Sequence, residues 1–228
     1  EGFARAQFNL ALCYHHGDFV EKDFDEALKW YHKSADQGNM NAAYALAMMY
    51  YKGEEIQRDM EKAFHYFEIA SKKGHTMARH YLAECYTFGQ GVEQDFEQAA
   101  VWYTQAAEKN NLDSMVNLGI CYTEGLGVEQ NYEKAFYWFD LAAGKGYAAA
   151  EYNLGLCYLN GEGVEKDEAK AVDYFTRAAK QELSDAQYTL ALCCRDGIGT
   201  AKDDEQYKYW LEKAASHGQE EAVELLNA

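Results

Sequence analysis

The sequence of 228 residues contains no proline, although a chain of this length usually holds about 11. This absence excludes proline-rich linkers and polyproline segments, and it argues against most loop-rich β folds. Basic residues are also scarce, since 21 lysines and arginines stand against 38 aspartates and glutamates, and a net charge of −17 repels a phosphate backbone. No apolar run approaches the roughly 18 residues of a membrane-spanning helix. We therefore expect neither nucleic acid binding nor membrane insertion.

Internal repetition is the strongest signal in the sequence. Glycines recur in steps of 36 residues at Gly17, Gly53, Gly89, Gly125, Gly161 and Gly197, and a second series with the same step contains Gly38, Gly74, Gly146 and Gly218. A constant period of this length is typical of stacked structural repeats. It predicts one repeat domain over residues 1–228, with units 3–38, 39–74, 75–110, 111–146, 147–182 and 183–218 and a closing helix at 219–228.

Each unit carries the pattern of two helices. In the fifth unit, Ala150, Leu154, Cys157 and Tyr158 have the spacing of one helical face, which we expect to lie against the second helix of the unit. The small Gly155 lies on another face, where we expect a neighbouring helix to approach. Neither helix can bury its apolar face alone, so stacking of the pairs is needed to form the core.

The second helix opens with an aspartate or asparagine in every unit, a residue type that caps helix N-termini by accepting from first-turn amides. The six positions are Asp23, Asp59, Asp95, Asn131, Asp167 and Asp203. Glu26, Gln98 and Gln206 follow three residues after the cap, which predicts a capping box in those units.

These residues form the motifs A-x-x-x-L-G-x-x-Y, G-x-G-V, D-x-x-x-A and W-Y/F-x-x-A-A, as in the segment NLGICYTEGLGVEQNYEKAFYWFDLAA at residues 117–143. The pattern resembles the Sel-one-like repeat, a branch of the tetratricopeptide-like α/α superhelices, over essentially the whole chain. The resemblance implies an all-α, right-handed α/α superhelical solenoid of six helix-turn-helix repeats plus a C-terminal closing helix. The sequence departs from the pattern at Phe19, Glu55, Asn110, Glu182 and Tyr207, and at these places the pattern does not predict the local shape of the chain.

The six cysteines fit a core position. Five of them share one position of the repeat, and stacked repeats place such residues about 10 Å apart, beyond the roughly 4.4–6.8 Å between the Cα atoms of a disulfide. We expect reduced thiols, which favour a reducing, cytoplasmic compartment. The chain begins EGFARAQ, without methionine or a leader, so a periplasmic or secreted protein whose leader has been removed is the alternative.

Residues for catalysis are hard to find. The seven histidines have no metal-site spacing, and we expect most of them at the surface. The glycine-rich turns lack the flanking residues of a phosphate loop, and G-x-S-x-G and S-x-x-K motifs do not occur. We therefore predict no catalytic, cofactor-binding or metal-binding residues. The adjacent Cys193 and Cys194 are the one unusual feature.

A third face of the first helix is left after packing, and its residues form three columns, a column being one repeat position followed through successive units. We call the predicted set the groove face, because the matching face lines the concave groove of tetratricopeptide-like folds. Its rings are Phe8, Tyr44, His80, Tyr152 and Tyr188; its second column contributes Asn9, Tyr81, Asn117 and Asn153; its third contributes Met48, Glu84, Ile120, Leu156 and Leu192. An extended segment could place side chains between the rings and pair with the amides. Alternatively, the ring and aliphatic columns pack against the adjoining first helix, and asparagine is simply common at this place in such repeats.

The resemblance implies a non-enzymatic adaptor or scaffold that binds another protein or an extended peptide, and the groove face is its predicted binding site. We expect a monomer, with a homodimer as the alternative. Two other functions stay open. The chain could be a structural module that assembles with copies of itself, or a weak hydrolase that uses the cysteine pair or clustered carboxylates.

Overall fold

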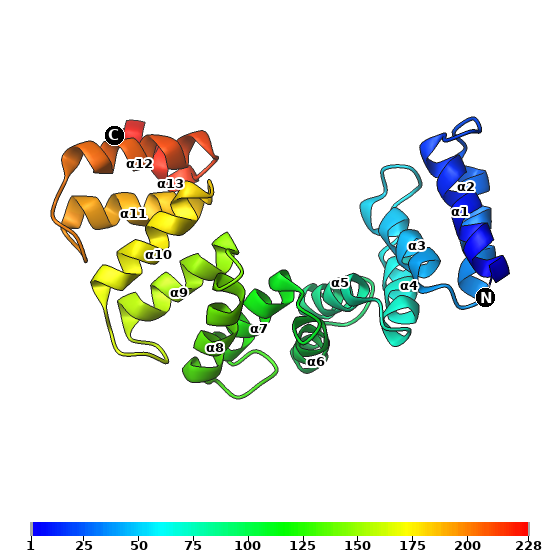
Figure 1. Cartoon of the computed structure of the whole chain (residues 1–228), viewed down its shortest axis with the longest axis horizontal. Helices are drawn as coiled ribbons and strands as arrows, with labels where there is room; N and C mark the ends of the chain where they lie inside the picture. The colour runs from blue at the N-terminus through cyan, green and yellow to red at the C-terminus, as the bar shows by residue number, and fades with distance from the viewer. Residues whose placement is uncertain (1, 228) are drawn as a thin grey trace. The chain divides into compact units, whose positions relative to one another are not determined.

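The computed structural model describes residues 2–227, and every regular element in this range is an α-helix (Figure 1). The chain is an all-α repeat solenoid, in which odd-numbered helices are the first helices of the repeats and even-numbered ones the second. The helices are α1 (Gly2–His16), α2 (Phe24–Asp36), α3 (Met40–Lys52), α4 (Met60–Lys72), α5 (Thr76–Phe88), α6 (Phe96–Ala107), α7 (Leu112–Glu124), α8 (Tyr132–Ala143), α9 (Ala148–Asn160), α10 (Glu168–Lys180), α11 (Ser184–Asp196), α12 (Asp204–Ser216) and α13 (Glu220–Asn227).

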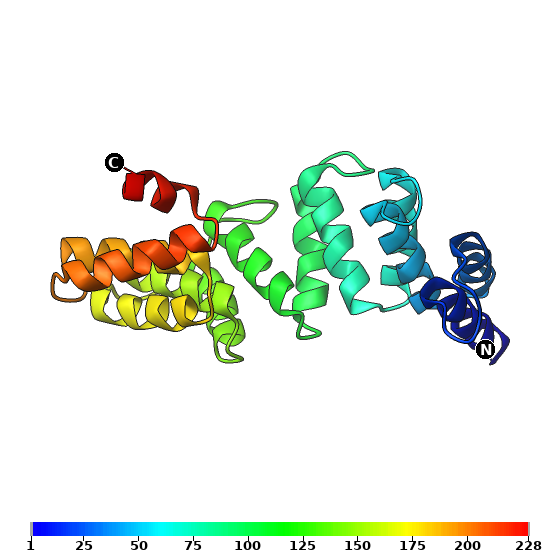
Figure 2. The ribbon, with the colours of Figure 1, turned by 90° about the horizontal axis from the view of Figure 1, so that it is seen from above.

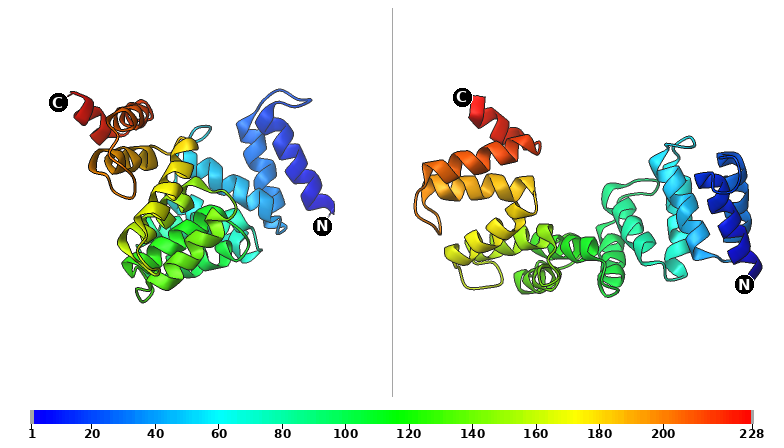
Figure 3. Two further views of the ribbon diagram at one scale, coloured as in Figure 1. Left: turned by 60° about the vertical axis from the view of Figure 1, so that its left-hand side comes forward. Right: turned by 45° about the horizontal axis from the view of Figure 1, so that its top comes forward.

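The two helices of a repeat lie side by side, as α3 and α4 or α11 and α12 do, and within each unit second helices contact the first helix of the next repeat, as α4 contacts α5 and α10 contacts α11 (Figures 2 and 3). The chain divides into two compact units, one up to Ser114 and one from Met115 on, with the border inside α7. In the second unit α13 packs on α12 through the buried Ala222. One repeat domain over residues 1–228 stays a prediction.

The six predicted caps are all formed, because each aspartate or asparagine side chain accepts from first-turn amides of its second helix. The predicted capping box is wrong. The backbone N–H of Asp23, which Glu26 would have satisfied, donates to the carbonyl oxygen of Tyr14 at 3.0 Å, and the other five caps repeat this bond to the end of their own first helix. The side chain of Glu26 instead accepts from Lys29 and Trp30. The bond ties the end of each first helix to the start of the second.

The small residue on the first helix faces the second helix of the same repeat. A Cβ at Gly155 would overlap the ring of Phe175, and a Cβ at Gly119 would overlap that of Phe139. A helix does approach Gly155, as expected, but it is the second helix of the same repeat, which we expected on the other face. The ring is the larger partner in this contact, so the first helix must supply the small residue.

The loop between the two helices packs on the preceding repeat. A Cβ at Gly199 would lie on the carbonyl oxygen of Glu168, the first residue of α10, which explains the second glycine of the G-x-G motif. Three departures from the glycine pattern keep the left-handed backbone, since φ is 66° at Phe19, 63° at Asn110 and 66° at Glu182. Glu55 does not have a positive φ, so the loop of repeat two takes a different path.

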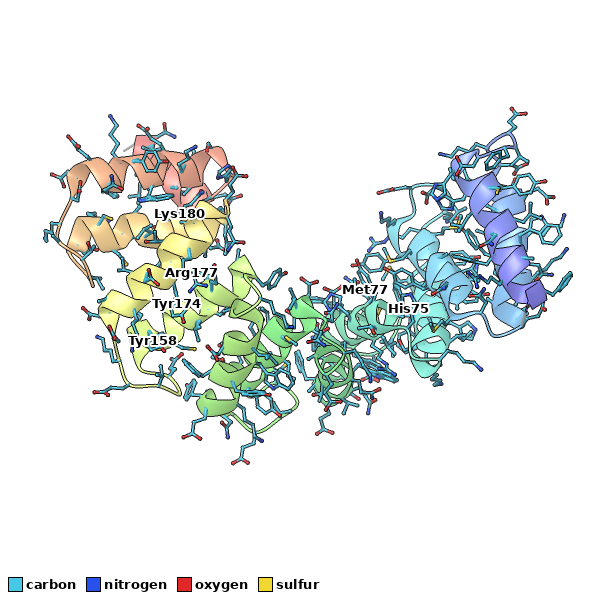
Figure 4. The ribbon with its side chains drawn as sticks, in the orientation of Figure 1. His75, Met77, Tyr158, Tyr174, Arg177 and Lys180 are labelled. Carbon is cyan, nitrogen blue, oxygen red and sulfur yellow. The ribbon has the colours of Figure 1, made fainter. Side chains whose placement is uncertain are left out.

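A buried carboxylate links α9 to α10. Glu151 is 2% exposed, and its two oxygens accept from the guanidinium of Arg177 and from the amide of Gln181, the latter at 2.7 Å. Arg177 lies 5.1 Å from the ring of Tyr174, which holds the guanidinium in place; Figure 4 shows both along α10. The same column holds glutamines in repeats one and six, Gln7 and Gln187, which bond to the ends of their second helices.

We expect Arg177→Met to destabilise the protein by about 2 kcal/mol, because the buried side chain of Glu151 loses its charged partner. This is less than the roughly 3–5 kcal/mol of a fully buried pair, since the Arg177 side chain is 45% exposed. Glu151→Gln places the residue of repeats one and six at this position, and it should lower the free energy of unfolding by less. Midpoints of urea unfolding measure both changes, and an unchanged midpoint for Arg177→Met would show that Glu151 is hydrated.

Candidate functional site

The ring column of the groove face is half-buried, because its rings also pack on the second helices. The ring centroid of Phe8 lies 5.9 Å from that of Tyr31, Tyr44 lies 6.2 Å from Phe67, and Tyr152 lies 5.7 Å from Phe175. Tyr188 is half-buried as well. Each of these rings therefore packs with one edge on the second helix of its own repeat and reaches the surface with the other, whereas the alternative expected from the sequence was packing on the adjoining first helix.

His80 differs from the rest of this column. It is 6% exposed, and its Nδ1 lies 3.0 Å from the hydroxyl oxygen of Ser114. A buried imidazole paired in this way does not line an open surface, so the placement of His80 on the groove face is corrected. Of the other six histidines, His16, His65 and His217 are exposed and His15, His32 and His75 are half-buried, so His80 is the one buried histidine among residues 2–227.

The other two columns reach the surface to different degrees. Asn9 is exposed and Ile120 is 37% exposed, while the remaining members are half-buried: Tyr81, Asn117, Asn153, Met48, Glu84, Leu156 and Leu192. The amide of Asn153 donates to the carbonyl oxygen of Ala149 at 2.7 Å. Its carbonyl group and its second N–H are left for other partners.

The largest pocket described in the first unit has a volume of about 440 Å³ and lies between the first helices of repeats one and two. Three predicted groove residues line it, together with residues that the sequence did not single out. The lining is Phe8 and His15 of α1, Asn41, Tyr44, Ala45, Met48, Met49 and Lys52 of α3, Glu55 of the following loop, and His75 before α5. We call it the first pocket.

A second pocket, of about 240 Å³, lies at the corresponding place between repeats four and five in the other unit. It is lined by Ile120, Thr123 and Glu124 of α7, Phe139 of α8, Asn153, Leu156, Cys157 and Asn160 of α9, and Glu162 of the loop. Five of its residues stand 108 residues, or three repeats, after residues of the first pocket. The second pocket is therefore the same structural feature, repeated.

The equivalent space between repeats two and three is filled by rings. Tyr81 takes the column position of Ala45, and its ring stacks on Phe67 at 5.3 Å and lies 5.4 Å from Tyr51. Ala45 is the smallest member of its column, and this was the signal in the sequence for the first pocket. Glu55, in place of the usual glycine, was a second signal.

Two histidines of the first pocket are kept neutral by their surroundings. Burial lowers the pKa of His15, and the neighbouring His16 lowers it further, while Glu55 at 3.7 Å opposes this. Burial also lowers the pKa of His75, whose Nδ1 caps α5 by accepting from the N–H of Ala78 at 3.1 Å. His75 stands at the start of α5 in Figure 4, and its ring stacks on Tyr44 with the centroids 4.2 Å apart.

The cysteines do not form a reactive centre. All six are free, and every one except the half-buried Cys13 is buried. Burial raises the pKa of Cys85 and Cys157 to about 12 and that of Cys121 and Cys193 to about 11, and it raises the pKa of Cys194. A thiol must ionise to act as a nucleophile, so these side chains are held in the unreactive form.

Over residues 2–227, no three His, Cys, Asp or Glu side chains form a group that could hold a metal ion. Within the same range, no helix combines the length and the apolar character needed to cross a membrane.

The stacked helix pairs define a helical repeat protein. Its two corresponding pockets are lined mostly by residues of the first helices. The sequence matches the Sel1 repeat family six times, at residues 4–39, 41–75, 76–111, 112–147, 148–183 and 184–219. The chain therefore belongs to the Sel1 repeat family. Sel1 repeats and their tetratricopeptide-like relatives generally mediate protein–protein interactions, and Sel1 repeat proteins are generally non-catalytic scaffolds.

Solved structures agree with this assignment. A Sel1 repeat protein from Oxalobacter formigenes is 37% identical, with a TM-score of 0.82 over 98% of this chain and 65% of that one. A protective antigen present in uropathogenic Escherichia coli strains is 31% identical, with a TM-score of 0.85 over 97% of this chain and 47% of that one. The chain thus spans less than two thirds of either protein.

More distant structures share the fold alone. An immunity protein from Pseudomonas aeruginosa is 21% identical, with a TM-score of 0.58 over 96% of this chain and 83% of that one. No curated protein matches the sequence significantly.

We expect native protein to react with a thiol reagent in two phases, with Cys13 first, because it is the one cysteine that is not buried. The other five should react only as the protein opens, and denatured, unreduced protein should titrate as six thiols. Cys13→Ser should remove the fast phase. Fast labelling of Cys193 or Cys194 in that variant would instead support the hydrolase alternative.

We expect the stability contributed by His75 to fall in acid. The folded state keeps its pKa low, so this contribution is complete above the unfolded pKa of about 6.5 and is lost as the pH falls through the lower folded value. His75→Asn places the capping residue of α3 at this position. The melting temperature of this variant should depend less steeply on pH between about pH 8 and pH 5 than that of the wild type. Part of the slope should persist, since burial also lowers the pKa of His15 and His32. An unchanged slope in the variant would contradict the role of the cap.

Proposed function

We propose that the chain is a non-enzymatic scaffold that binds an extended segment of a partner protein along the groove face. The observation that carries the proposal is the recurrence of one pocket at corresponding places in both units, each time lined by predicted groove residues. A pocket that recurs with the repeat suits a linear ligand, whose side chains can enter successive pockets.

The composition of the two pockets supports a peptide as the ligand. Both are lined by rings and aliphatic or thioether side chains, such as Phe8 and Met48 or Phe139 and Leu156. Amides and charged groups, including Asn41 and Asn153, also line them. Apolar lining takes up side chains, while the amides can pair with the peptide groups between them.

Exposed positions give the clearest test, because the rings of this face also pack inside their repeats. Ile120 is 37% exposed and lines the second pocket, and Met48 lines the first. Leu141 of α8 is also 37% exposed but lies on a second helix, outside both pockets. It is a matched control for the same aliphatic-to-glutamate change.

Random peptides displayed on phage would be selected on the immobilised wild-type chain, and the dissociation constants of the selected peptides measured by fluorescence anisotropy. Ile120→Glu or Met48→Glu, or the two together, should weaken binding at least tenfold, about 1.4 kcal/mol. Leu141→Glu should leave it within about twofold. Melting curves of each variant confirm that the repeats stay folded.

The proposal is wrong if the double variant is folded and binds the selected peptides as tightly as the wild type. It is also wrong if Leu141→Glu is equally harmful, because the ligand would then lie on the second helices. Light scattering of the free protein, over a range of concentrations, distinguishes a monomeric scaffold from the self-assembling alternative.

A further inference from the structure

The first pocket lies where a column that holds a ring in the next repeat holds only an alanine. In repeat three the column position holds Tyr81, whose ring lies 6.3 Å from Tyr44 and 5.4 Å from Tyr51. In repeat two the position holds Ala45, and the equivalents of those two neighbours are Phe8 and His15, which line the pocket. The pocket therefore occupies the place that the chain fills with an aromatic ring one repeat later.

The side chains around this space suit an aromatic ring. Phe8 and Tyr44 offer ring surfaces, and Met48 and Met49 offer thioethers, which make favourable contacts with aromatic rings and adapt to their shape. The volume of about 440 Å³ lies in the range of pockets that take small ligands or bulky side chains.

The charges near the pocket favour a cationic neighbour for that ring. Glu55 lines the pocket, and its side chain is 22% exposed. Glu84 is the groove-face residue of the next repeat at the column position of Met48, and its side chain is 23% exposed. Lys52 is the one lysine or arginine in the described lining, and the low pKa of His15 and His75 keeps both imidazoles neutral near pH 7. The chain as a whole carries −17, so its field attracts a basic segment and repels an acidic one.

We infer that the first pocket takes an aromatic side chain from a partner segment in which lysine or arginine flanks that residue. The inference rests on the proposed function and specifies the chemistry of its ligand. The aromatic ring replaces the missing equivalent of Tyr81, between Phe8, Tyr44 and the two methionines. The flanking cations lie toward Glu55 and Glu84.

The probe is a short synthetic peptide with one central tryptophan between lysines, compared with one whose centre is alanine and one whose flanks are glutamate. Binding is followed through the methyl signals of the methionines, since Met48 and Met49 line the pocket while the buried Met115 belongs to the other unit. The lysine-flanked tryptophan peptide should shift Met48 and Met49 and leave Met115 unmoved. Each comparison peptide should bind at least tenfold more weakly at low salt.

Ala45→Tyr is the decisive variant, because it places the residue of repeat three in the pocket. It should fold with a melting temperature at or above that of the wild type and lose at least tenfold in affinity for the tryptophan peptide. Ala45→Ser, which leaves the pocket open, should bind within about twofold of the wild type. High salt should weaken binding of the lysine-flanked peptide.

Several results would overturn the inference. The pocket is not the site if Ala45→Tyr is folded and binds equally well, or if Met48 and Met49 do not respond to millimolar tryptophan peptide. The ligand chemistry is wrong if the alanine-centred or glutamate-flanked peptide binds as tightly. The peptides selected by phage display test the groove face independently. If Ile120→Glu weakens their binding, the scaffold proposal remains supported even where this inference fails.

Discussion

Each repeat is held together where a large side chain of its second helix packs against a glycine or alanine of its first helix; this side chain is a ring in repeats one to five and Leu211 in repeat six. Phe139 fits against Gly119 and Phe175 against Gly155, and all four residues are buried. A larger residue on the first helix would push the ring away and separate the two helices. The contact uses one face of the first helix, so stacking between repeats and the groove face must use the others. The half-buried rings of the groove face follow from this, because they border the same contact.

Much of this architecture could be predicted from the sequence, because the features that define it are local and repeated. The period of 36 residues and the six cap positions each correspond to one structural requirement, and Asp23 or Asn131 performs it without help from distant residues. Features that depend on a choice between two neighbours were predicted less well. Gly155 could have met either of two helices, and the amide of Asp23 could have bonded to Glu26 or to Tyr14.

The candidate site shows the same division. The columns of the groove face were visible in the sequence, but how deeply each member is buried was not, and His80 is buried because Ser114 of a neighbouring repeat accepts or donates a hydrogen bond there. The first pocket depends on the size of Ala45 relative to Tyr81 and on the path of the loop at Glu55. A pocket is a property of several repeats at once, so one column cannot predict it.

In the loop of the first repeat, two reasons for a glycine can be distinguished. One is the left-handed backbone of the turn, and the other is close contact with the preceding repeat. Phe19 keeps the left-handed backbone of the second glycine position with its side chain fully exposed, so the turn itself tolerates a large residue. At Gly199 a Cβ would instead strike the start of α10. Glycine at this position therefore serves the junction between repeats more than the turn. Arrays lengthened by joining copies of this chain would need glycine in place of Phe19 at each new junction.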